Sequence, residues 1–251
     1  MTARRRATGR LPGWPAESEP SSSAEPLTLD RILEAALRIA DAEGLDALSM
    51  RRLGSELGAG ATSLYWHVRN KDELLDLLVD RVIGEMLAEI EPADGWRAQM
   101  GAAARTARRV LVRHRHLAPV FGSRPTFGPN ALQAIELVVG QLRAAGFDDL
   151  TASLGANAVI TWASGYAVFE ARDPLGPNAS EEERTAYAAA IAETFARLPP
   201  ERFPNTVSML PLMSEITADS QFESALGWLL DGLELTLPRG GRGETGATPR
   251  G

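Results

Sequence analysis

The fold is decided by the stretch from Leu45 to Leu78, which reads LDALSMRRLGSELGAGATSLYWHVRNKDELLDLL. Two short segments with helical spacing of apolar residues lie in it, from about Ser49 to Leu57 and from about Thr62 to Val68. Ser49 is a residue type that caps helix N-termini, and Gly58-Ala59-Gly60 makes a turn between the segments. Two short helices joined by a tight glycine-containing turn are a helix-turn-helix. The stretch therefore predicts that the second segment lies in the major groove of DNA while the first braces it.

The second segment has an inner and an outer face. Leu64 and Val68 are four residues apart and are expected to face inward. The other side chains would then face solvent or DNA; they are Thr62, Ser63, Tyr65, Trp66 and His67. An exposed Tyr-Trp pair indicates a partner surface. The local pattern leaves open the alternative that Tyr65 and Trp66 pack against the preceding helix.

Helical periodicity continues through most of the chain. One helix is expected from Leu29 to about Ala40, ended by Gly44, and another from Asn70 to near Pro92. Further helices are expected over 95–116, 129–145, 150–172, 180–197, 206–217 and 220–237. Capping-box patterns begin at Asn70, Ser180 and Ser220, each with Glu three residues later. No alternating segment is long enough for a confident strand, so the predicted fold class is all-α.

Composition excludes several functional classes. The 251 residues contain no cysteine and three histidines, which argues against disulfides, thiolate metal sites and histidine-rich metal cages. The literal GxGxxG at Gly241 to Gly246 lies in a tail, without the strand and helix that a dinucleotide site needs. Neither a P-loop nor the HExxH and GxSxG signatures occurs, so no enzyme is expected. The net charge is −7, yet four basic residues and one acidic residue stand between Ser49 and Lys71.

The chain is expected to consist of two structured parts between two disordered tails. Residues 1–26 are rich in Pro, Ser, Glu and Arg and predict a disordered arm, and 238–251 predict a disordered tail. Between them we expect a three-helix DNA-binding domain with its connecting helix over 27–90 and a larger helical domain over 91–237. The basic start is not followed by an apolar run, and no segment could span a bilayer. These features predict a cytoplasmic protein without a membrane partner.

The stretch from Leu45 to Leu78 resembles the DNA-binding domain of the tetracycline-repressor (TetR) family. The most specific part is Leu64-Tyr-Trp-His-Val68, followed by Asn70-Lys71. Later landmarks resemble the C-terminal domain of tetracycline repressors proper; they are Trp96, His114-Arg115, Gly122-Ser-Arg-Pro125 and Gly146-Phe147. The resemblance implies a ligand-responsive regulator of transcription, a homodimer whose C-terminal helices enclose a small-molecule pocket.

The resemblance also implies which residues touch double-stranded operator DNA. Matching positions on the two short helices are Ser49, Met50, Arg51, Ala61, Thr62, Ser63, Tyr65, Trp66 and His67, with Lys71 as a phosphate anchor. Arg51 is the preferred base reader, because its guanidinium can pair with guanine through two hydrogen bonds. Tyr65, His67 and Lys71 are expected on phosphates. Ala61 replaces a polar residue of tetracycline repressors, so the operator sequence need not be shared.

Two segments are expected to form the dimer interface. Residues 152–172 are apolar over much of the helix circumference, and the last helix has a broad apolar stripe from Phe222 to Leu237. Both could instead pack inside the monomer. With the resemblance, we expect two helices from each subunit to form a four-helix interface.

The effector is expected to be small and largely apolar. In the family, a histidine holds the magnesium–tetracycline chelate, but this chain has Val120 and Phe121 near that position. Other polar residues that contact the drug in the family are also replaced, since the matching positions fall near Leu87, Ala103 and Ala107. No cofactor or metal ion is therefore expected. The candidate lining residues are Phe121, Arg124, Phe127, Trp162, Tyr166 and Phe169. For the aromatic residues, plain core or dimer contact is the competing interpretation.

A repressor released by its effector is the expected function. The alternatives are a transcriptional activator and a DNA-binding module that does not respond to ligand. Whether such a protein represses or activates depends on where the operator lies relative to the promoter, and a protein sequence does not contain that information.

Overall fold

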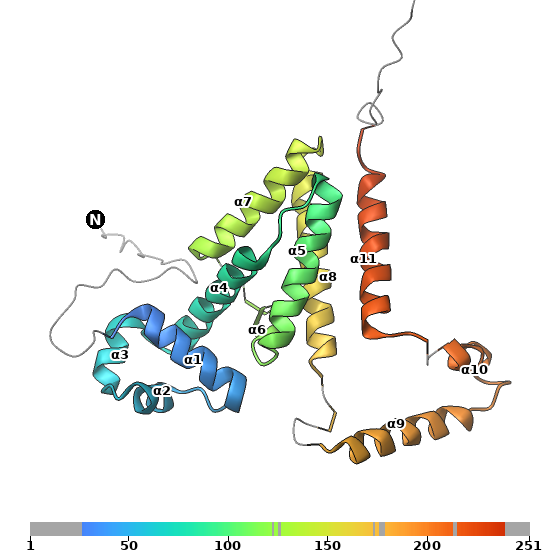
Figure 1. Cartoon of the computed structure of the whole chain (residues 1–251), viewed down its shortest axis with the longest axis horizontal. Helices are drawn as coiled ribbons and strands as arrows, with labels where there is room; N and C mark the ends of the chain where they lie inside the picture. Colours follow the sequence, from blue (N-terminus) through green and yellow to red (C-terminus); the bar gives the residue numbers. More distant parts are fainter. Residues whose placement is uncertain are drawn as a thin grey trace, which may run out of the picture.

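The computed structural model describes residues 27–121, 123–124, 127–172, 174–175, 179–212 and 215–238. The expected arm over 1–26 lies outside the described residues, as does all but the first residue of the expected tail over 238–251. Within the described ranges every regular element is a helix, which confirms the all-α fold (Figure 1). No helix in this part of the chain is both long and apolar enough to cross a membrane.

Three short helices form a head at one end of the molecule (Figure 1). They are α1 (Leu29–Glu43), α2 (Met50–Leu57) and α3 (Ala61–His67). Thr28 caps α1 by accepting a hydrogen bond from Arg31 N at 3.3 Å, and Gly44 ends that helix at a φ of 84°. One apolar side chain from each helix is completely buried where the three helices meet; they are Ile32, Leu53 and Leu64.

A long helix, α4 (Lys71–Glu89), runs from the head into a helical body. Asn70 begins it, because its Oδ1 accepts a hydrogen bond from Glu73 N at 2.8 Å. The body contains α5 (Gly95–Arg113), α7 (Pro129–Ala144) and α8 (Asp149–Glu170), with α5 packed along α8 and α4 against α7. The buried carboxylate of Asp80 accepts from Ala131 N at 2.9 Å and so ties α4 to the first turn of α7. The head is therefore continuous with the body through α4.

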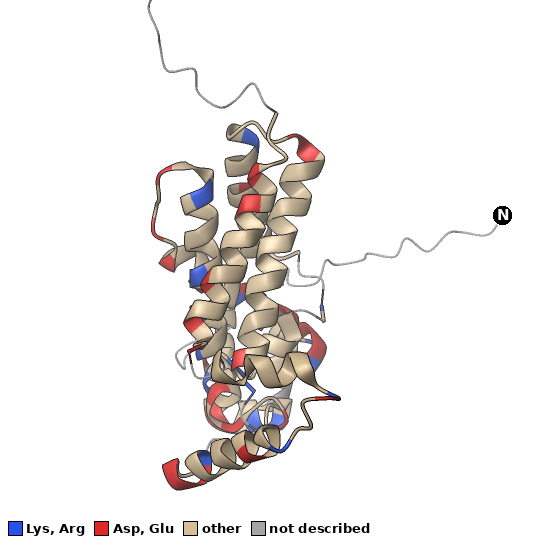
Figure 2. Ribbon diagram, turned by 90° about the vertical axis from the view of Figure 1, so that its right-hand side faces the viewer, with Lys and Arg blue, Asp and Glu red and all other residues tan. Residues whose placement is uncertain are grey.

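The last helix, α11 (Ala218–Glu234), lies beside α8 (Figure 1). A glycine allows this close approach, because a Cβ at Gly155 would stand 2.7 Å from Leu233 Cδ1. By contrast, α9 (Glu181–Ala196) and α10 (Pro204–Met209) project away from the bundle, and no residue of α9 is buried. Seen from the α11 side, charged residues gather toward the two ends and the middle of the bundle is mainly uncharged (Figure 2).

Several expected boundaries were wrong. The helix expected over 95–116 ends at Arg113, because His114 leaves helical geometry and begins a turn to a short unpredicted helix, α6 (Ala118–Phe121). The helix expected over 206–217 is α10 followed by a 3-10 turn at Leu210–Leu212. The box at Ser180 is confirmed, but α11 is capped by Thr217, with Ser220 as the third residue of its box. Glu223, expected to complete a box from Ser220, instead pairs with Arg105 at 2.7 Å.

Candidate nucleic-acid interface and effector cavity

Local hydrogen bonds and two glycines shape the turn between α2 and α3. Ser49 Oγ accepts from Arg52 N at 3.1 Å and starts α2, as expected. Gly58 ends it with a left-handed φ of 60°, a conformation that favours glycine. Ala59 N then donates to Gly54 O at 3.0 Å, and a Cβ at Gly54 would already lie 3.0 Å from Ala59 O. The missing side chain at Gly54 thus lets the turn and Leu64 of α3 approach α2 closely, and Gly58 supplies the left-handed residue that ends α2.

The outer face of α3 is open. Leu64 and Val68 are completely buried, whereas Tyr65 is 50% exposed and Trp66 is 79% exposed. This excludes the alternative in which Tyr65 and Trp66 pack into the head. Thr62 and Ser63 are also exposed, His67 is half-buried, and Ala61 is the first residue of α3. The structure thus gathers an aromatic and hydroxyl surface on one side of a short helix.

Two adjacent arginines on α2 have different surroundings. Arg52 is held by Glu43 of α1 at 2.6 Å and by Glu56 at 2.8 Å, and these hydrogen bonds raise its pKa. Arg51 is exposed beside it and is ion-paired with none of the described residues. Arg52 therefore holds α2 on α1, while Arg51 keeps its donors available for an outside partner. Ser49 is exposed and Met50 is half-buried at the start of the same helix.

Lys71 has an intramolecular partner. Its Nζ donates to Leu45 O at 2.6 Å, and the side chain is partly buried at the start of α4. The ammonium group has three protons, so two can still reach a phosphate. Lys71 thus holds the loop before α2, and its expected role as a phosphate anchor stays a prediction.

An apolar cavity of about 350 Å³ lies between α4, α5, α7 and α8. Leu87, Ala103 and Ala107, where the sequence predicted an apolar environment, line it, and so do the expected Phe121 and Arg124. The other described lining residues are Val79, Ile83, Met86, Ile90, Ala131, Ala134, Ile135, Val138, Asn157 and Ile160. A second space of about 320 Å³ shares part of this wall and extends to Ser153 and Met100. The wall is aliphatic, with Arg124, Asn157 and Ser153 as its polar groups.

Four of the expected lining residues lie elsewhere. Trp162 and Tyr166 face α11, where Trp162 stacks on Phe222 and Tyr166 Oη donates to Ala218 O at 2.7 Å. Phe169 and Phe127 are exposed and do not line the cavity. The spacing of Trp162, Tyr166 and Phe169 predicted that the three rings share one face of α8, and neighbouring rings of this set do lie in contact. That face of α8 is turned away from the cavity. The competing interpretation as core or dimer contact fits these residues better.

Two of the lining residues also had a signal in their spacing. Ala103 and Ala107 are one helical turn apart on α5, and small side chains at that spacing leave room against a neighbouring helix. The aliphatic residues of α7 gave no such signal, because they look like ordinary core positions.

Arg124 has a second role beside lining the cavity. Its guanidinium pairs with Asp72 at 2.5 Å and with Asp76 at 3.1 Å, both near the start of α4. The hydrogen bonds that the guanidinium donates to these carboxylates raise the pKa of Arg124. Arg124 therefore joins the segment after α6 to the connecting helix, and a ligand carboxylate would have to compete with two aspartates.

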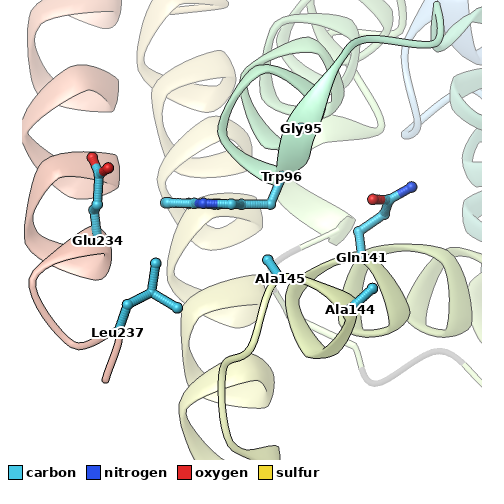
Figure 3. A pocket seen from close by; sticks show the side chains of 7 residues that line it. All are labelled: Gly95, Trp96, Gln141, Ala144, Ala145, Glu234 and Leu237. Atoms are coloured by element: carbon cyan, nitrogen blue, oxygen red, sulfur yellow. The ribbon is translucent and has the colours of Figure 1, made fainter. Parts of the chain in front are cut away.

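A different, open cleft (Figure 3) lies where α5 begins and α7 and α11 end, at the end of the body far from the head (Figure 1). Its volume is about 480 Å³, and the indole of Trp96 crosses it between α11 and α7. Trp96 packs edge-on against Phe147 with ring centres 5.0 Å apart, and the Glu234 carboxylate on the opposite side pairs with Arg97. This cleft does not touch α4, whereas the apolar cavity does. Of these two spaces, the apolar cavity is therefore the one that contacts the helix connecting head and body.

Outward apolar side chains follow α8 and α11. They are Leu150, Leu154 and Phe169 on α8, Trp228 on α11 and Leu235 directly after α11. The two helices pack against each other in the bundle. Such a surface indicates a protein contact.

Comparison with known proteins links these features to one group. Residues 32–78 match the family model for bacterial regulatory proteins of the tetR family, and residues 90–237 match the tetracyclin repressor-like C-terminal domain. The HTH-type transcriptional repressor DrrR1 of Streptomyces coeruleorubidus is 37% identical over 243 residues, 92% of this chain and 86% of that protein. The class A tetracycline repressor of Escherichia coli is 29% identical, covering 80% of this chain and 88% of its own length.

Solved structures give the same result. ActR of Streptomyces coelicolor in complex with actinorhodin is 36% identical, with a TM-score of 0.76 over 86% of this chain and 100% of that chain. Apo ActR gives a TM-score of 0.72 at 37% identity, covering 84% and 96%.

Proposed function

This chain belongs to the TetR family of bacterial regulatory proteins, and on that premise we propose that it is a transcriptional repressor that a small effector releases from operator DNA. The observation that carries the proposal is the open outer face of α3, together with an exposed Arg51 on α2 that forms no ion pair with any described residue. A helix of this kind in the major groove reads base edges, and tyrosine, serine and threonine hydroxyls position it on phosphates. The family is one of regulators, not enzymes.

The reading residues we propose are those expected from the sequence. Arg51 of α2 reads bases. The DNA-contacting residues of α3 are Ala61, Thr62, Ser63, Tyr65, Trp66 and His67. Ser49 and Met50 at the start of α2 and Lys71 at the start of α4 lie at the edge of the DNA-contacting surface. The exposure of Arg51, Tyr65 and Trp66 supports this assignment. We take residues 27–90 as the DNA-binding unit and 91–237 as the ligand-binding and dimerisation unit.

The regulator is a homodimer in this proposal. The exposed apolar side chains of α8 and α11 would pair with the same helices of a second copy and form a four-helix interface. Two heads would then be separated by about 34–36 Å, one turn of B-form DNA. The operator is accordingly an inverted repeat.

The effector is a largely apolar molecule held between α4, α5, α7 and α8. ActR, whose structure contains actinorhodin, has the same fold, which supports a small-molecule effector for this chain as well. The aliphatic wall would bury the apolar parts of the effector, and Arg124 and Asn157 would meet its few polar groups. An effector without a metal ion fits this wall better than a magnesium chelate.

The connecting helix α4 would transmit ligand binding to DNA. Val79 and Ile83 touch the cavity, while Lys71 at the start of the same helix is bonded to the head loop at Leu45 O. A ligand that displaces α4 therefore changes the posture of the head. The ligand can change the fraction of operator that is bound only to the extent that it binds the two postures of the head with different affinities.

Two experiments in sequence test this function. Full-length protein would be used to select duplexes from a random pool at about 50–100 mM salt, where phosphate contacts are strong. An enriched inverted repeat supports the proposal, and absence of any retained duplex contradicts it. The enriched duplex would then be challenged with polycyclic aromatic compounds, using Ala107→Phe, which narrows the cavity, as the matched control for release through this site.

A further inference from the structure

His114 joins three helices at the junction of head and body. It follows the last residue of α5, and only 5% of its surface is exposed. Its Nδ1 lies 2.8 Å from Asp41 Oδ2 on α1, and its Nε2 lies 3.0 Å from Glu85 Oε2 on α4. One imidazole therefore bridges a carboxylate of the head and a carboxylate of the connecting helix.

This geometry requires the charged form of the ring. A neutral imidazole has one N–H, so one carboxylate would face a lone pair, whereas imidazolium donates to both. Burial by itself lowers the pKa of His114, but the hydrogen bonds and charges of Asp41 and Glu85 outweigh it, so the pKa lies above its ordinary value. The pKa of Glu85 is lowered: burial raises it, but hydrogen bonds from His114 and Arg113 more than compensate.

The two carboxylates depend on His114 to different degrees. Glu85 has a second cation, because Arg113 reaches it at 2.9 Å and reaches Glu89 of the same helix at 2.7 Å. Asp41 has His114 as its cation, and its Oδ1 is buried without a hydrogen-bond partner among the described residues. Loss of the proton from His114 would therefore leave the Asp41 carboxylate uncompensated. His116, the next histidine, lies against Gly44 at the end of α1.

We propose that charged His114 is a positioning residue for DNA binding, holding α1 of the head on the body so that operator affinity falls when His114 loses its proton. The inference rests on the proposed DNA-binding function. A dimer presents two heads to one duplex, and heads already held in place spend less free energy on ordering when they bind.

The sign of the pH effect follows from the ionic bridge. A histidine with a raised folded-state pKa stabilises the junction fully below its unfolded pKa, about 6.5, and loses that contribution as pH rises through the folded pKa. Operator affinity should therefore be highest near pH 6 and should decline toward pH 9. Coupling between sites commonly changes affinity by about fivefold or more.

The test compares wild type with His114→Gln, Asp41→Asn and, as the matched histidine control, His116→Gln. Affinity for the selected duplex would be measured by fluorescence anisotropy from pH 6 to pH 9 at constant ionic strength and well below the melting temperature. We expect the DNA affinity of wild type and of His116→Gln to fall by about fivefold or more between pH 6 and pH 9. His114→Gln and Asp41→Asn should bind weakly at pH 6 and show a flatter profile. His67 of the reading helix is unchanged in every variant, so differences between their pH profiles do not arise from that residue.

NMR titration of the histidine ring protons tests the charge without DNA. The three histidines would be assigned from the single variants, and His114 should titrate above pH 6.5, at a lower pH in Asp41→Asn. An unchanged pH profile in His114→Gln, a flat profile in wild type, or titration of His114 below about pH 6.5 would each overturn the inference. If His114→Gln fails to fold, Asp41→Asn decides by the same criteria. Failure to enrich any duplex would instead refute the proposed function, whatever the NMR titration shows.

Discussion

Replacing Arg51 with alanine should separate DNA recognition from folding. Arg51 is exposed and unpaired among the described residues, so its removal should leave the denaturant midpoint unchanged. A guanidinium that reads a guanine contributes about 1–3 kcal/mol to discrimination. Since a dimer loses two such contacts, the loss is about 2–6 kcal/mol, or about 30-fold in affinity at the lower end.

Arg52→Ala is the matched control, because it removes the same side chain one position later. Arg52 bonds Glu43 and Glu56, so this variant should unfold at lower denaturant concentration and lose less DNA affinity than Arg51→Ala. Both would be measured by anisotropy on the selected duplex and by urea unfolding.

The salt dependence distinguishes two roles for Arg51. A base contact, once lost, relaxes sequence preference at one position of each half-site, whereas a lost phosphate contact weakens all duplexes alike and reduces the salt slope by about 1 per contact. Unchanged affinity of Arg51→Ala for the selected duplex would refute the placement of the reading surface. A larger loss with Arg52→Ala in fully folded protein would do the same.

Four further substitutions test the remaining features. Leu64→Ala, which empties a completely buried position of α3, should destabilise the protein by about 2–5 kcal/mol in urea unfolding, while Trp66→Ala should stay within about 0.5 kcal/mol and lose DNA affinity. Equal stability of the two variants would contradict the assigned faces of α3. Ala107→Phe should fill the effector cavity, so that the duplex is still bound but polycyclic compounds release it less; normal release would move the effector elsewhere. Gly155→Val should force α11 from α8 through contact with Leu233, cost about 1–3 kcal/mol and reduce the dimer fraction in light scattering, and an intact dimer would place the interface on other helices.

Where local rules decide, the sequence predicted the structure closely. Ser49, Asn70 and Ser180 begin their helices because their side chains accept hydrogen bonds from nearby backbone N–H groups. Periodicity likewise placed Leu64 inward and Trp66 outward, since helical spacing fixes which side chains share a face. These predictions depend on residues within one or two turns of each other.

The effector site shows where such rules end. The sequence predicted an apolar effector from Leu87, Ala103 and Ala107, and these three residues line the apolar cavity. It could not say that the face of α8 carrying Trp162 turns toward α11, because helical spacing fixes relative directions on a helix and not its rotation in the bundle. Similarly, Ser220 is a residue type that often caps helices, but the N-cap of α11 is Thr217, three residues earlier.

The sequence by itself determined an all-α chain with a helix-turn-helix near its start, because capping residues, glycine turns and apolar spacing act over a few residues. Only the tertiary structure decided which partners meet across the chain, such as His114 with Asp41, 73 positions apart, and Arg124 with Asp72 and Asp76. Those contacts depend on how whole helices rotate and pack to bury their apolar faces. The charge of a buried histidine is set by that packing, and no local pattern contains it.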